Sequence, residues 1–253
     1  MRDVIVLPDP MAVAEAAAQR LAGFLLESQS LASATHVALT GGGTGIAVLD
    51  RLRANPLLGA ISWPDVHFWW GDERFVAAGS PERNDSQARR ALLDHLPEAP
   101  GGTHPVSAAN EGLSLEEAAT RYTADLRRHQ VRFDLVLLGV GPDGHVASIF
   151  PGAGDGTGLA APGAFAVPNS PKPPPARVSL TLDTINAARQ VWLVAAGSAK
   201  RDAVAAALGL AARPAPQQES AGPADAARAP VPAARVAGRE RTLWLVDAAA
   251  AAA

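Results

Sequence analysis

The chain has 253 residues, 48% of them hydrophobic, and its 22 Lys and Arg against 25 Asp and Glu give a formal net charge of −3. This length and apolar content predict one folded domain over residues 1–253 and exclude general disorder, while the mild acidity argues against a nucleic-acid partner. The absence of Cys excludes disulfides, thiolate metal sites and a Cys nucleophile. The sequence has neither an apolar run of membrane-spanning length nor a signal-peptide pattern, so we expect no membrane partner and a cytoplasmic location.

The first half of the sequence alternates between helices and apolar strands. Asp9 is a natural N-cap and Pro10 a natural first-turn residue, so we expect a helix from this point. Two short apolar runs, residues 36–39 and 66–70, are predicted as strands. The first leads through the glycine-rich residues 40–45 into a helix from Ile46 to about Arg53, and the second leads through residues 71–74 to a helix near residues 86–95.

The second half repeats this alternation. Ser114 and Glu117 form a capping box that opens a helix. Residues 133–140 are the most strand-like stretch, and residues 191–196 and 242–246 are two further strands, the former followed by an Ala-rich helix. Strands that are apolar on both faces and alternate with helices predict a three-layer α/β/α fold around a mostly parallel, doubly wound sheet.

Gly and Pro exceed their usual share, with 23 and 21 residues, and the excess is unevenly placed. Part of it lies in the turns that follow the strands. The rest lies in two stretches. We interpret residues 151–175 as an ordered, Pro-rich surface excursion of the domain and residues 213–238 as a flexible loop.

Residues 40–45, Thr-Gly-Gly-Gly-Thr-Gly, follow a strand and open a helix. Glycines let backbone N–H groups approach an anion, and the helix N-terminus adds partial positive charge. Thr44 could cap the helix and donate its hydroxyl. Because the sequence matches neither GxGxxG nor a Walker loop, it favours a small phosphate monoester over a dinucleotide or nucleoside triphosphate. A tight strand–helix turn with no ligand is the alternative.

Charged and polar residues follow three other strands. Asp72, Glu73 and Arg74 come directly after an apolar strand, and Arg74 suits anion recognition, although a solvated loop with an internal ion pair is also open. Lys200 lies in a first helical turn, where an anion would resolve its conflict with the helix dipole; a Lys that bends into solvent is the alternative.

His145 is the sharpest candidate, because it alone among six histidines follows a strand-end Gly-rich turn, Gly-Pro-Asp-Gly-His. A His titrates near neutral pH and is the commonest general base, and Asp143 could orient it or bind a substrate hydroxyl. A helix-capping His is the alternative. The other histidines are interpreted as strand residues, His36 and His67, or as surface residues, His95, His104 and His129.

Other chemistries find little support in the sequence. There is no G-x-S-x-G nucleophile elbow, and no HExxH or His/Asp cluster at metal-ligand spacing. We therefore expect no metal site.

Together these segments resemble the glucosamine-6-phosphate isomerase/6-phosphogluconolactonase family, and within it the lactonases of the oxidative pentose phosphate pathway. The resemblance covers nearly the whole chain and implies a Rossmann-like fold with no cofactor. It rests on segments that occur in the family's order: Thr40–Thr44, Trp70–Val76, Arg83–Ser86, Leu138–Pro151 and Gly197–Lys200.

The resemblance implies hydrolysis of 6-phospho-D-glucono-1,5-lactone by a water molecule that His145 activates. Asp143 and Asp72 would position His145 or the sugar hydroxyls, and Arg74 would hold the phosphate or the lactone end. The remaining implied substrate and phosphate contacts are Thr40, Gly42, Gly43, Thr44, Asn84, Arg177 and Lys200.

One departure concerns the phosphate loop, where Gly45 stands in place of the Pro that often opens the helix in this family. Two rival functions remain: a glucosamine-6-phosphate deaminase, and a non-catalytic sugar-phosphate sensor. The deaminase normally carries a further acid after the His, and residues 146–150 contain none. The sensor usually carries a DNA-binding segment, and no basic N-terminal segment is present. We expect a monomer whose partner is a small phosphosugar lactone.

Overall fold

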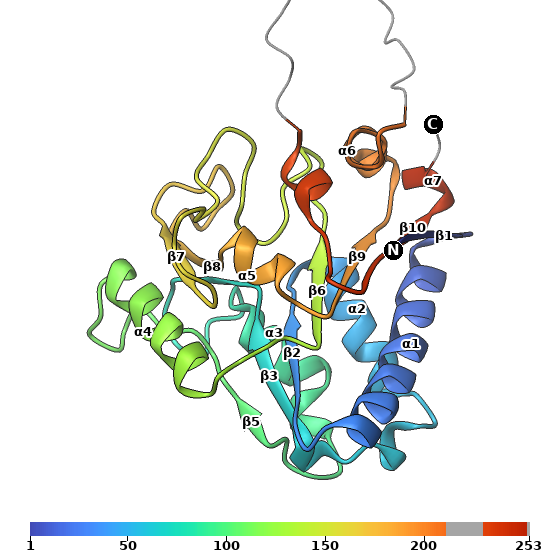
Figure 1. The fold of residues 1–253 in the computed structure, drawn as a ribbon, viewed down its shortest axis with the longest axis horizontal. Helices are drawn as coiled ribbons and strands as arrows, with labels where there is room; N and C mark the ends of the chain where they lie inside the picture. Colours follow the sequence, from blue (N-terminus) through green and yellow to red (C-terminus); the bar gives the residue numbers. More distant parts are fainter. Residues whose placement is uncertain (211–229, 252–253) are drawn as a thin grey trace, which may run out of the picture.

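The computed structural model describes residues 1–210 and 230–251, and within these residues seven strands form one parallel sheet in the order β1-β10-β9-β6-β2-β3-β5 (Figure 1). Every neighbouring pair in this sheet runs parallel. The strands are β1 (Arg2–Leu7), β2 (Thr35–Leu39), β3 (Val66–Trp70), β5 (Gly102–Thr103), β6 (Leu135–Gly139), β9 (Gln190–Ala195) and β10 (Arg241–Asp247).

Helices cover both faces of this sheet, so the predicted three-layer arrangement is confirmed (Figure 1). One face packs against α1 (Pro10–Leu31), α2 (Gly42–Arg53) and α3 (Asn84–Ala91). The other face packs against α4 (Leu115–Arg128), α5 (Leu182–Asn186), α6 (Arg201–Leu208) and α7 (Ala248–Ala251).

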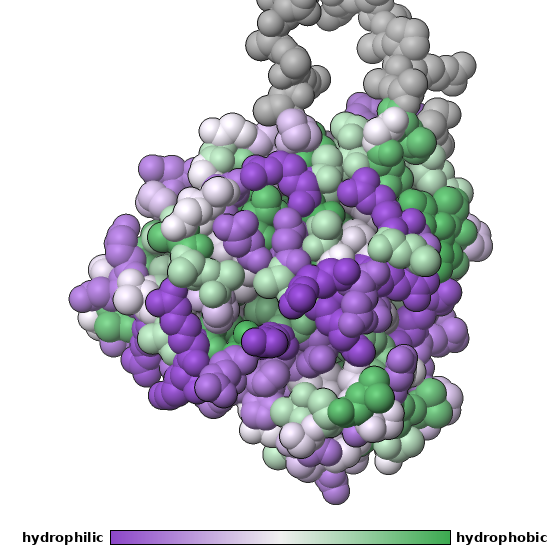
Figure 2. Space-filling view, in the orientation of Figure 1, coloured by the Kyte–Doolittle hydropathy of each residue, from purple (hydrophilic) through white to green (hydrophobic). Residues whose placement is uncertain are grey.

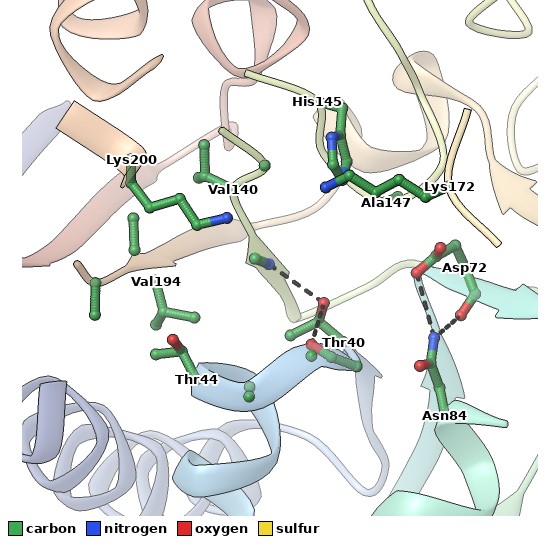
Figure 3. A pocket seen from close by; sticks show the side chains of 18 of the residues that line it. Thr40, Thr44, Asp72, Asn84, Val140, His145, Ala147, Lys172, Val194 and Lys200 are labelled. Atoms are coloured by element: carbon green, nitrogen blue, oxygen red, sulfur yellow. Dashed lines mark hydrogen bonds between the residues drawn. The ribbon is translucent and has the colours of Figure 1, made fainter. Parts of the chain in front are cut away.

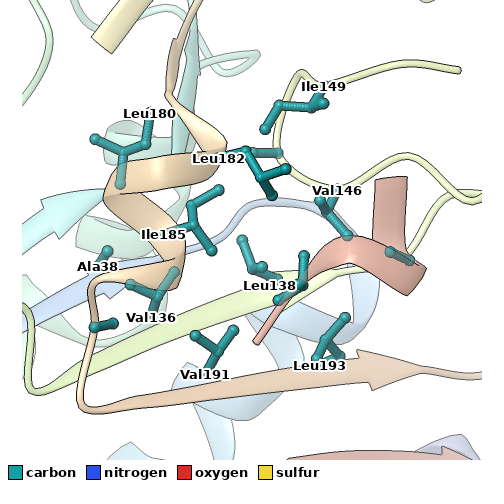
Figure 4. Close-up of a cluster of buried hydrophobic side chains, with 14 of the residues drawn as sticks. Ala38, Val136, Leu138, Val146, Ile149, Leu180, Leu182, Ile185, Val191 and Leu193 are labelled. Carbon is teal, nitrogen blue, oxygen red and sulfur yellow. The ribbon is translucent and has the colours of Figure 1, made fainter. Parts of the chain in front are cut away.

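The apolar strands predicted from the sequence separate two hydrophobic clusters. Successive residues of a strand point to opposite faces, and Val37 and Ala38 of β2 accordingly belong to different clusters. Figure 4 shows the cluster on the α5 side, where Leu182 and Ile185 lie over the strands. Both faces of β2 and β6 are therefore buried, which explains why these strands are apolar throughout.

The chain order places a switch point between β2 and β6. From β2 the chain adds β3 and then β5 on one side, and it returns to place β6 on the other side of β2. In open parallel sheets, ligands bind outside the carboxyl ends of the strands at such a point. This boundary is therefore the expected position of a binding site.

A second, antiparallel sheet lies against the α4 side of the fold, with the order β4-β8-β7. Its strands are β4 (Asp72–Arg74), β7 (Ala164–Val167) and β8 (Arg177–Leu180). The Pro-rich segment 151–175 thus contains β7, so it is a part of the folded body and not only a surface excursion. Of the predicted flexible loop 213–238, residues 213–229 lie outside the described residues, and Pro232–Arg235 form a 3-10 turn.

Several boundaries differ from the sequence predictions. Residues 2–7 form the edge strand β1, which was not predicted. The helix expected from Ile46 begins at Gly42, and the helix expected over residues 86–95 is α3 followed by a 3-10 turn, Leu93–His95. The other described 3-10 turns are Leu58–Ala60, Trp63–Asp65 and Ser198–Lys200.

The surface drawn in Figure 2 is mostly hydrophilic, and its hydrophobic colour gathers on the right, over β1 and α7. Val4 and Val6 of the edge strand are exposed. No helix in the described ranges, 1–210 and 230–251, is both long enough and apolar enough to cross a membrane.

Candidate active site

An open pocket of about 340 Å³ lies at the carboxyl ends of β2 and β6, at the predicted switch point (Figure 3). It brings together segments that are far apart in the sequence. All but one of the predicted site residues line it: Thr40, Gly42, Gly43, Thr44, Asp72, Arg74, Asn84, His145, Arg177 and Lys200. The exception, Asp143, contacts His145 from outside the pocket lining.

The glycine-rich loop forms the floor of the pocket and the start of α2. Gly42 has a φ of +80°, a backbone conformation that favours glycine, and Gly41 is the N-cap. No side chain of the described residues caps this helix, so Thr44 lies in the first turn and is not the cap that the sequence suggested. The first-turn N–H groups have no intrahelical partners and are available to an anion.

Thr40, which follows β2, is hydrogen-bonded to the end of β6. Its side chain is buried, and Gly139 N, at the end of β6, donates to Thr40 Oγ1 at 3.2 Å. Gly45 packs against it, because a Cβ at position 45 would lie 2.5 Å from Thr40 Cγ2. The departure at Gly45 therefore has a packing reason in this chain.

Lys200 reaches the pocket from the opposite wall, at the end of the 3-10 turn Ser198–Lys200. Figure 3 shows its side chain extending into the middle of the pocket, with Thr44 below it in this view. Burial lowers the pKa of Lys200, and the nearby charge of Lys172 lowers it further. A cation that lines the same pocket as a helix N-terminus makes a suitable phosphate site.

Asp72, Arg74 and Asn84 form a connected group on the other side of the pocket. Asn84 Nδ2 donates to the Asp72 backbone oxygen at 2.7 Å, and Arg74 Nη1 donates to Asn84 Oδ1. Ser148 Oγ donates to Asp72 Oδ2 at 2.6 Å. Both ends of the Asn84 amide are thus used within the protein, and Asn84 connects Asp72 to Arg74.

Glu73 holds the backbone of this group through hydrogen bonds. Its carboxylate is fully buried and accepts from the backbone N of Arg74 at 2.8 Å and of Asn84 at 2.7 Å through Oε1, and from Asp85 N at 2.8 Å through Oε2. Burial raises the pKa of Glu73 to about 7, and the charge of Arg83 opposes this shift. A buried carboxylate at the N-terminus of α3 therefore holds the backbone of two pocket residues.

Arg177 is buried, and most of its donors serve the protein itself. Nε donates to Pro174 O at 3.1 Å, and Nη2 donates to Lys172 O at 3.1 Å and Pro173 O at 3.2 Å. Nη1 lies 3.6 Å from Asp72 Oδ2. The predicted substrate contact is thus also the residue that folds the Pro-rich loop against the pocket.

His145 and Asp143 form a pair at the top of the pocket. His145 Nδ1 lies 2.5 Å from Asp143 Oδ1, and because an ionised carboxylate only accepts, Nδ1 carries the hydrogen and Nε2 is left as the free base. Burial lowers the pKa of His145, and the contact with Asp143 opposes this shift. The pKa of Asp143 lies below its usual value, because partial burial raises it less than the bonds to His145 lower it. A neutral imidazole oriented by a carboxylate can accept a proton from water.

Sequence reasoning missed two polar residues of the site. Lys172 lines the pocket but was counted only as part of the Pro-rich segment, although a single Lys among the four prolines of residues 171–175 was a usable signal. Ser148 was noted only as part of a motif, and its contact with Asp72 spans 76 positions. Within the described residues, no group of three or more His, Asp or Glu is arranged to hold a metal ion.

Comparisons with known proteins identify the family of this chain. A family model described as glucosamine-6-phosphate isomerases/6-phosphogluconolactonase matches residues 8–244. A 6-phosphogluconolactonase of Streptomyces coelicolor is 43% identical, covering 98% of this chain and 93% of its own, and one of Mycobacterium tuberculosis is 40% identical, covering 98% and 96%.

Solved structures show the same fold. The 6-phosphogluconolactonase of Thermotoga maritima superposes with a TM-score of 0.80 at 26% identity, covering 98% of this chain and 100% of its own. A monomeric glucosamine-6-phosphate deaminase superposes with a TM-score of 0.76 at 17% identity, and the match covers 98% of each chain. At this identity the likeness shows a shared fold alone. With a family match over residues 8–244 and relatives at 40–43% identity along nearly the whole length, this chain belongs to the glucosamine-6-phosphate isomerase/6-phosphogluconolactonase family.

Proposed function

We propose that this protein hydrolyses 6-phospho-D-glucono-1,5-lactone to 6-phospho-D-gluconate. The observation that carries the proposal is one pocket in which the His145–Asp143 pair faces the uncapped start of α2 and Lys200. The His145–Asp143 pair offers a general base, and the start of α2 with Lys200 offers a place for the phosphate. A phosphorylated lactone requires both. The relatives that are 40–43% identical along the whole chain are named as lactonases.

In the proposed reaction the phosphate binds the first turn of α2, Gly42 to Thr44, and Lys200. His145 Nε2 takes a proton from a water molecule whose oxygen attacks the lactone carbonyl carbon. The bond from that carbon to the ring oxygen then breaks, and the imidazolium returns the proton to the ring oxygen. General-base assistance of this kind contributes about 10²–10⁴-fold to a rate.

The other predicted residues take supporting parts in this proposal. Asp143 holds the tautomer of His145. Arg74 and Asp72 contact the lactone end or the sugar hydroxyls. Thr40, Asn84 and Arg177 hold the pocket walls through the hydrogen bonds described above. No step needs a metal or an organic cofactor, because an activated ester, an oriented water and a base suffice.

The test is hydrolysis of freshly prepared lactone, corrected for spontaneous opening, beside ammonia release from glucosamine 6-phosphate. We expect lactone hydrolysis, a loss of about 10²–10⁴-fold in kcat for His145→Asn, and no loss for His95→Asn, the same change at an exposed His. Activity on the amino sugar alone would overturn the function. A wild-type rate in His145→Asn would overturn the assignment of the base.

We also propose that the protein acts as a monomer in the cytoplasm, on a small molecule and not on nucleic acid. A single chain supplies both the proposed base and the proposed phosphate contacts, and the net charge of −3 gives no general attraction to phosphate backbones. Light scattering after size-exclusion chromatography should give a mass near 26.0 kDa. A dimer mass at assay concentration would contradict the monomer.

A further inference from the structure

The loop that carries Lys172 is held on both sides by buried side chains. Ser170 Oγ accepts from Lys172 N at 3.2 Å and donates to Lys172 O at 3.0 Å. The Arg177 guanidinium donates to the same oxygen, and to the carbonyls of the next two residues. The backbone of Lys172 is therefore fixed, and its side chain starts from a defined point beside the pocket.

The Lys172 side chain is half-buried, lines the same pocket as His145, and runs toward His145 in Figure 3. Among the described residues no carboxylate forms an ion pair with it. A half-buried cation without a partner in a pocket favours a ligand or a transition state that carries negative charge.

The pocket's two ammonium groups come from different segments of the chain, and they lie close enough for the charge of Lys172 to lower the pKa of Lys200. Lys200 comes from the turn after β9, and Thr44 at the start of α2, where the phosphate is proposed to bind, lies below it in Figure 3. Lys172 comes from the loop before β8 and lies with His145. Lys200 is thus placed for the phosphate, and Lys172 is placed for the carbon atom that reacts.

We propose that Lys172 is a further catalytic residue, whose ammonium group stabilises the negative charge on the lactone carbonyl oxygen as water attacks. This inference rests on the proposed lactonase function. The carbonyl oxygen gains charge when the water oxygen bonds to the carbon and its proton passes to His145 Nε2. It loses that charge when the bond to the ring oxygen breaks and the ring oxygen takes the proton. Lys172 exchanges no proton in either step.

A cation in this position also acts on the base. The charge of Lys172 disfavours the imidazolium form and adds to burial in lowering the pKa of His145, while Asp143 raises it. The ammonium group thus keeps His145 neutral and ready to accept a proton at lower pH. One residue therefore serves both the base and the oxyanion.

The test compares Lys172→Gln, Lys172→Arg and Lys200→Gln with the wild type on freshly prepared lactone. Removal of one oxyanion donor typically costs about 10²–10³-fold in kcat, and we expect a loss of this size in Lys172→Gln with a smaller change in KM. Lys172→Arg, which keeps the charge, should recover part of the rate. Lys200→Gln should instead act mainly by raising KM.

The pH profile gives a second readout that a structural role would not move. Without the charge of Lys172, the acid limb of kcat/KM should shift to higher pH in Lys172→Gln. An unchanged kcat, or a rise in KM alone, would overturn the inference and place Lys172 at the phosphate. Wild-type protein that does not hydrolyse the lactone would overturn the proposed function and this inference together, whereas an active wild type with a fully active Lys172→Gln would overturn the inference alone.

Discussion

The imidazole of His145 fills the space that a side chain on Gly141 would need. A Cβ at position 141 would lie 2.0 Å from both Cε1 and Nδ1 of His145 and 2.5 Å from Asp143 Oδ1. Gly141 N also donates to His145 O at 2.9 Å, which closes the turn. Gly141, two residues after the end of β6, is therefore the residue that lets the base and its carboxylate lie against this turn.

Gly141→Ala should therefore displace His145 and reduce lactone hydrolysis by roughly 10²-fold, since a shift of about 1 Å at a reacting group can cost this much. The free energy of unfolding should change little by comparison with this loss of activity, because the displaced ring lies at the pocket surface. Activity assays and urea unfolding on the same preparation measure the two effects. Full activity in Gly141→Ala would show that His145 does not need its present position.

Gly23→Ala is the matched control. Gly23 is exposed in α1, and nothing lies within 4 Å of a Cβ built there. The substitution should leave activity unchanged and raise stability by about 0.4–1 kcal/mol, because alanine loses less backbone entropy in a helix.

The elements of the site that depend on short-range patterns could be predicted from the sequence. Apolar strands that end in glycine-rich turns indicated the parallel sheet, the phosphate loop and His145, because each signal lies within a few residues. The start of α2 could not be placed in this way. Its N-cap is Gly41, above which Asn84 packs, and a Cβ at position 41 would lie 1.8 Å from Asn84 Oδ1.

The positions that the sequence missed depend on contacts between distant segments. Lys172 becomes a pocket residue because Ser170 and Arg177 bond the backbone of its loop. Ser148 bonds Asp72, which lies 76 positions before it in the sequence. β1 is an edge strand that pairs with β10, whose residues follow it by more than 230 positions. Local patterns carry no information about such partners.

Arg177 should matter more for stability than an exposed arginine with a closer ion pair. Replacing it by Met removes the side-chain donor of Pro173 O and Pro174 O and one of the two donors of Lys172 O. It also leaves Asp72 without its buried cation. Breaking a buried pair costs about 3–5 kcal/mol, and Arg177→Met should lose this much in urea unfolding. Arg53→Met, which removes an exposed pair with Asp50 at 2.9 Å, should lose at most about 1 kcal/mol. Equal losses would contradict the structural role of Arg177.

Four histidines gather at the opposite end of the sheet, near the amino ends of β2 and β3. His67 Nδ1 lies 3.1 Å from His104 Nε2, and Trp69 Nε1 donates to His36 Nδ1 at 3.1 Å. His104 stacks on Trp69 with ring centroids 3.9 Å apart, so it is not the surface residue that the sequence suggested. The exposed His129 completes this histidine cluster, with its ring 4.7 Å from that of His104.

The histidine cluster should make the fold sensitive to acid. Burial, with the neighbouring histidine charges, lowers the pKa of His36 and of His104 from 6.5 to about 4. The unfolded chain therefore binds more protons than the native one between these values, and stability should fall as the pH falls from 6.5 to 4. Each extra proton that the unfolded chain binds lowers the free energy of unfolding by up to about 1.4 kcal/mol per pH unit. The effect should be smaller here, because the cluster is only half-buried.

His104→Phe tests this by keeping the stack on Trp69 and removing the charge. Unfolding free energies across this pH window should fall less steeply than in the wild type, whereas His95→Phe, at an exposed His outside the cluster, should leave the slope unchanged. Glu73 acts in the opposite direction, since its raised pKa removes stability as the pH rises from 4.5 to about 7. Because it does so equally in all three proteins, the difference in slope isolates His104. Identical slopes would show that the cluster does not take up protons on unfolding.

Asp143→Asn should change both kcat and the acid limb of the pH profile of kcat/KM. The carboxylate holds the hydrogen on Nδ1 and favours the imidazolium, so its loss should lower kcat by up to about 10²–10⁴-fold and lower the pKa of His145 further. The acid limb of kcat/KM should then shift to lower pH, opposite to the shift expected for Lys172→Gln. Profiles of the three proteins should therefore give limbs in the order Asp143→Asn, wild type, Lys172→Gln from low to high pH. A limb that stays at one pH in all three would belong to a group other than His145.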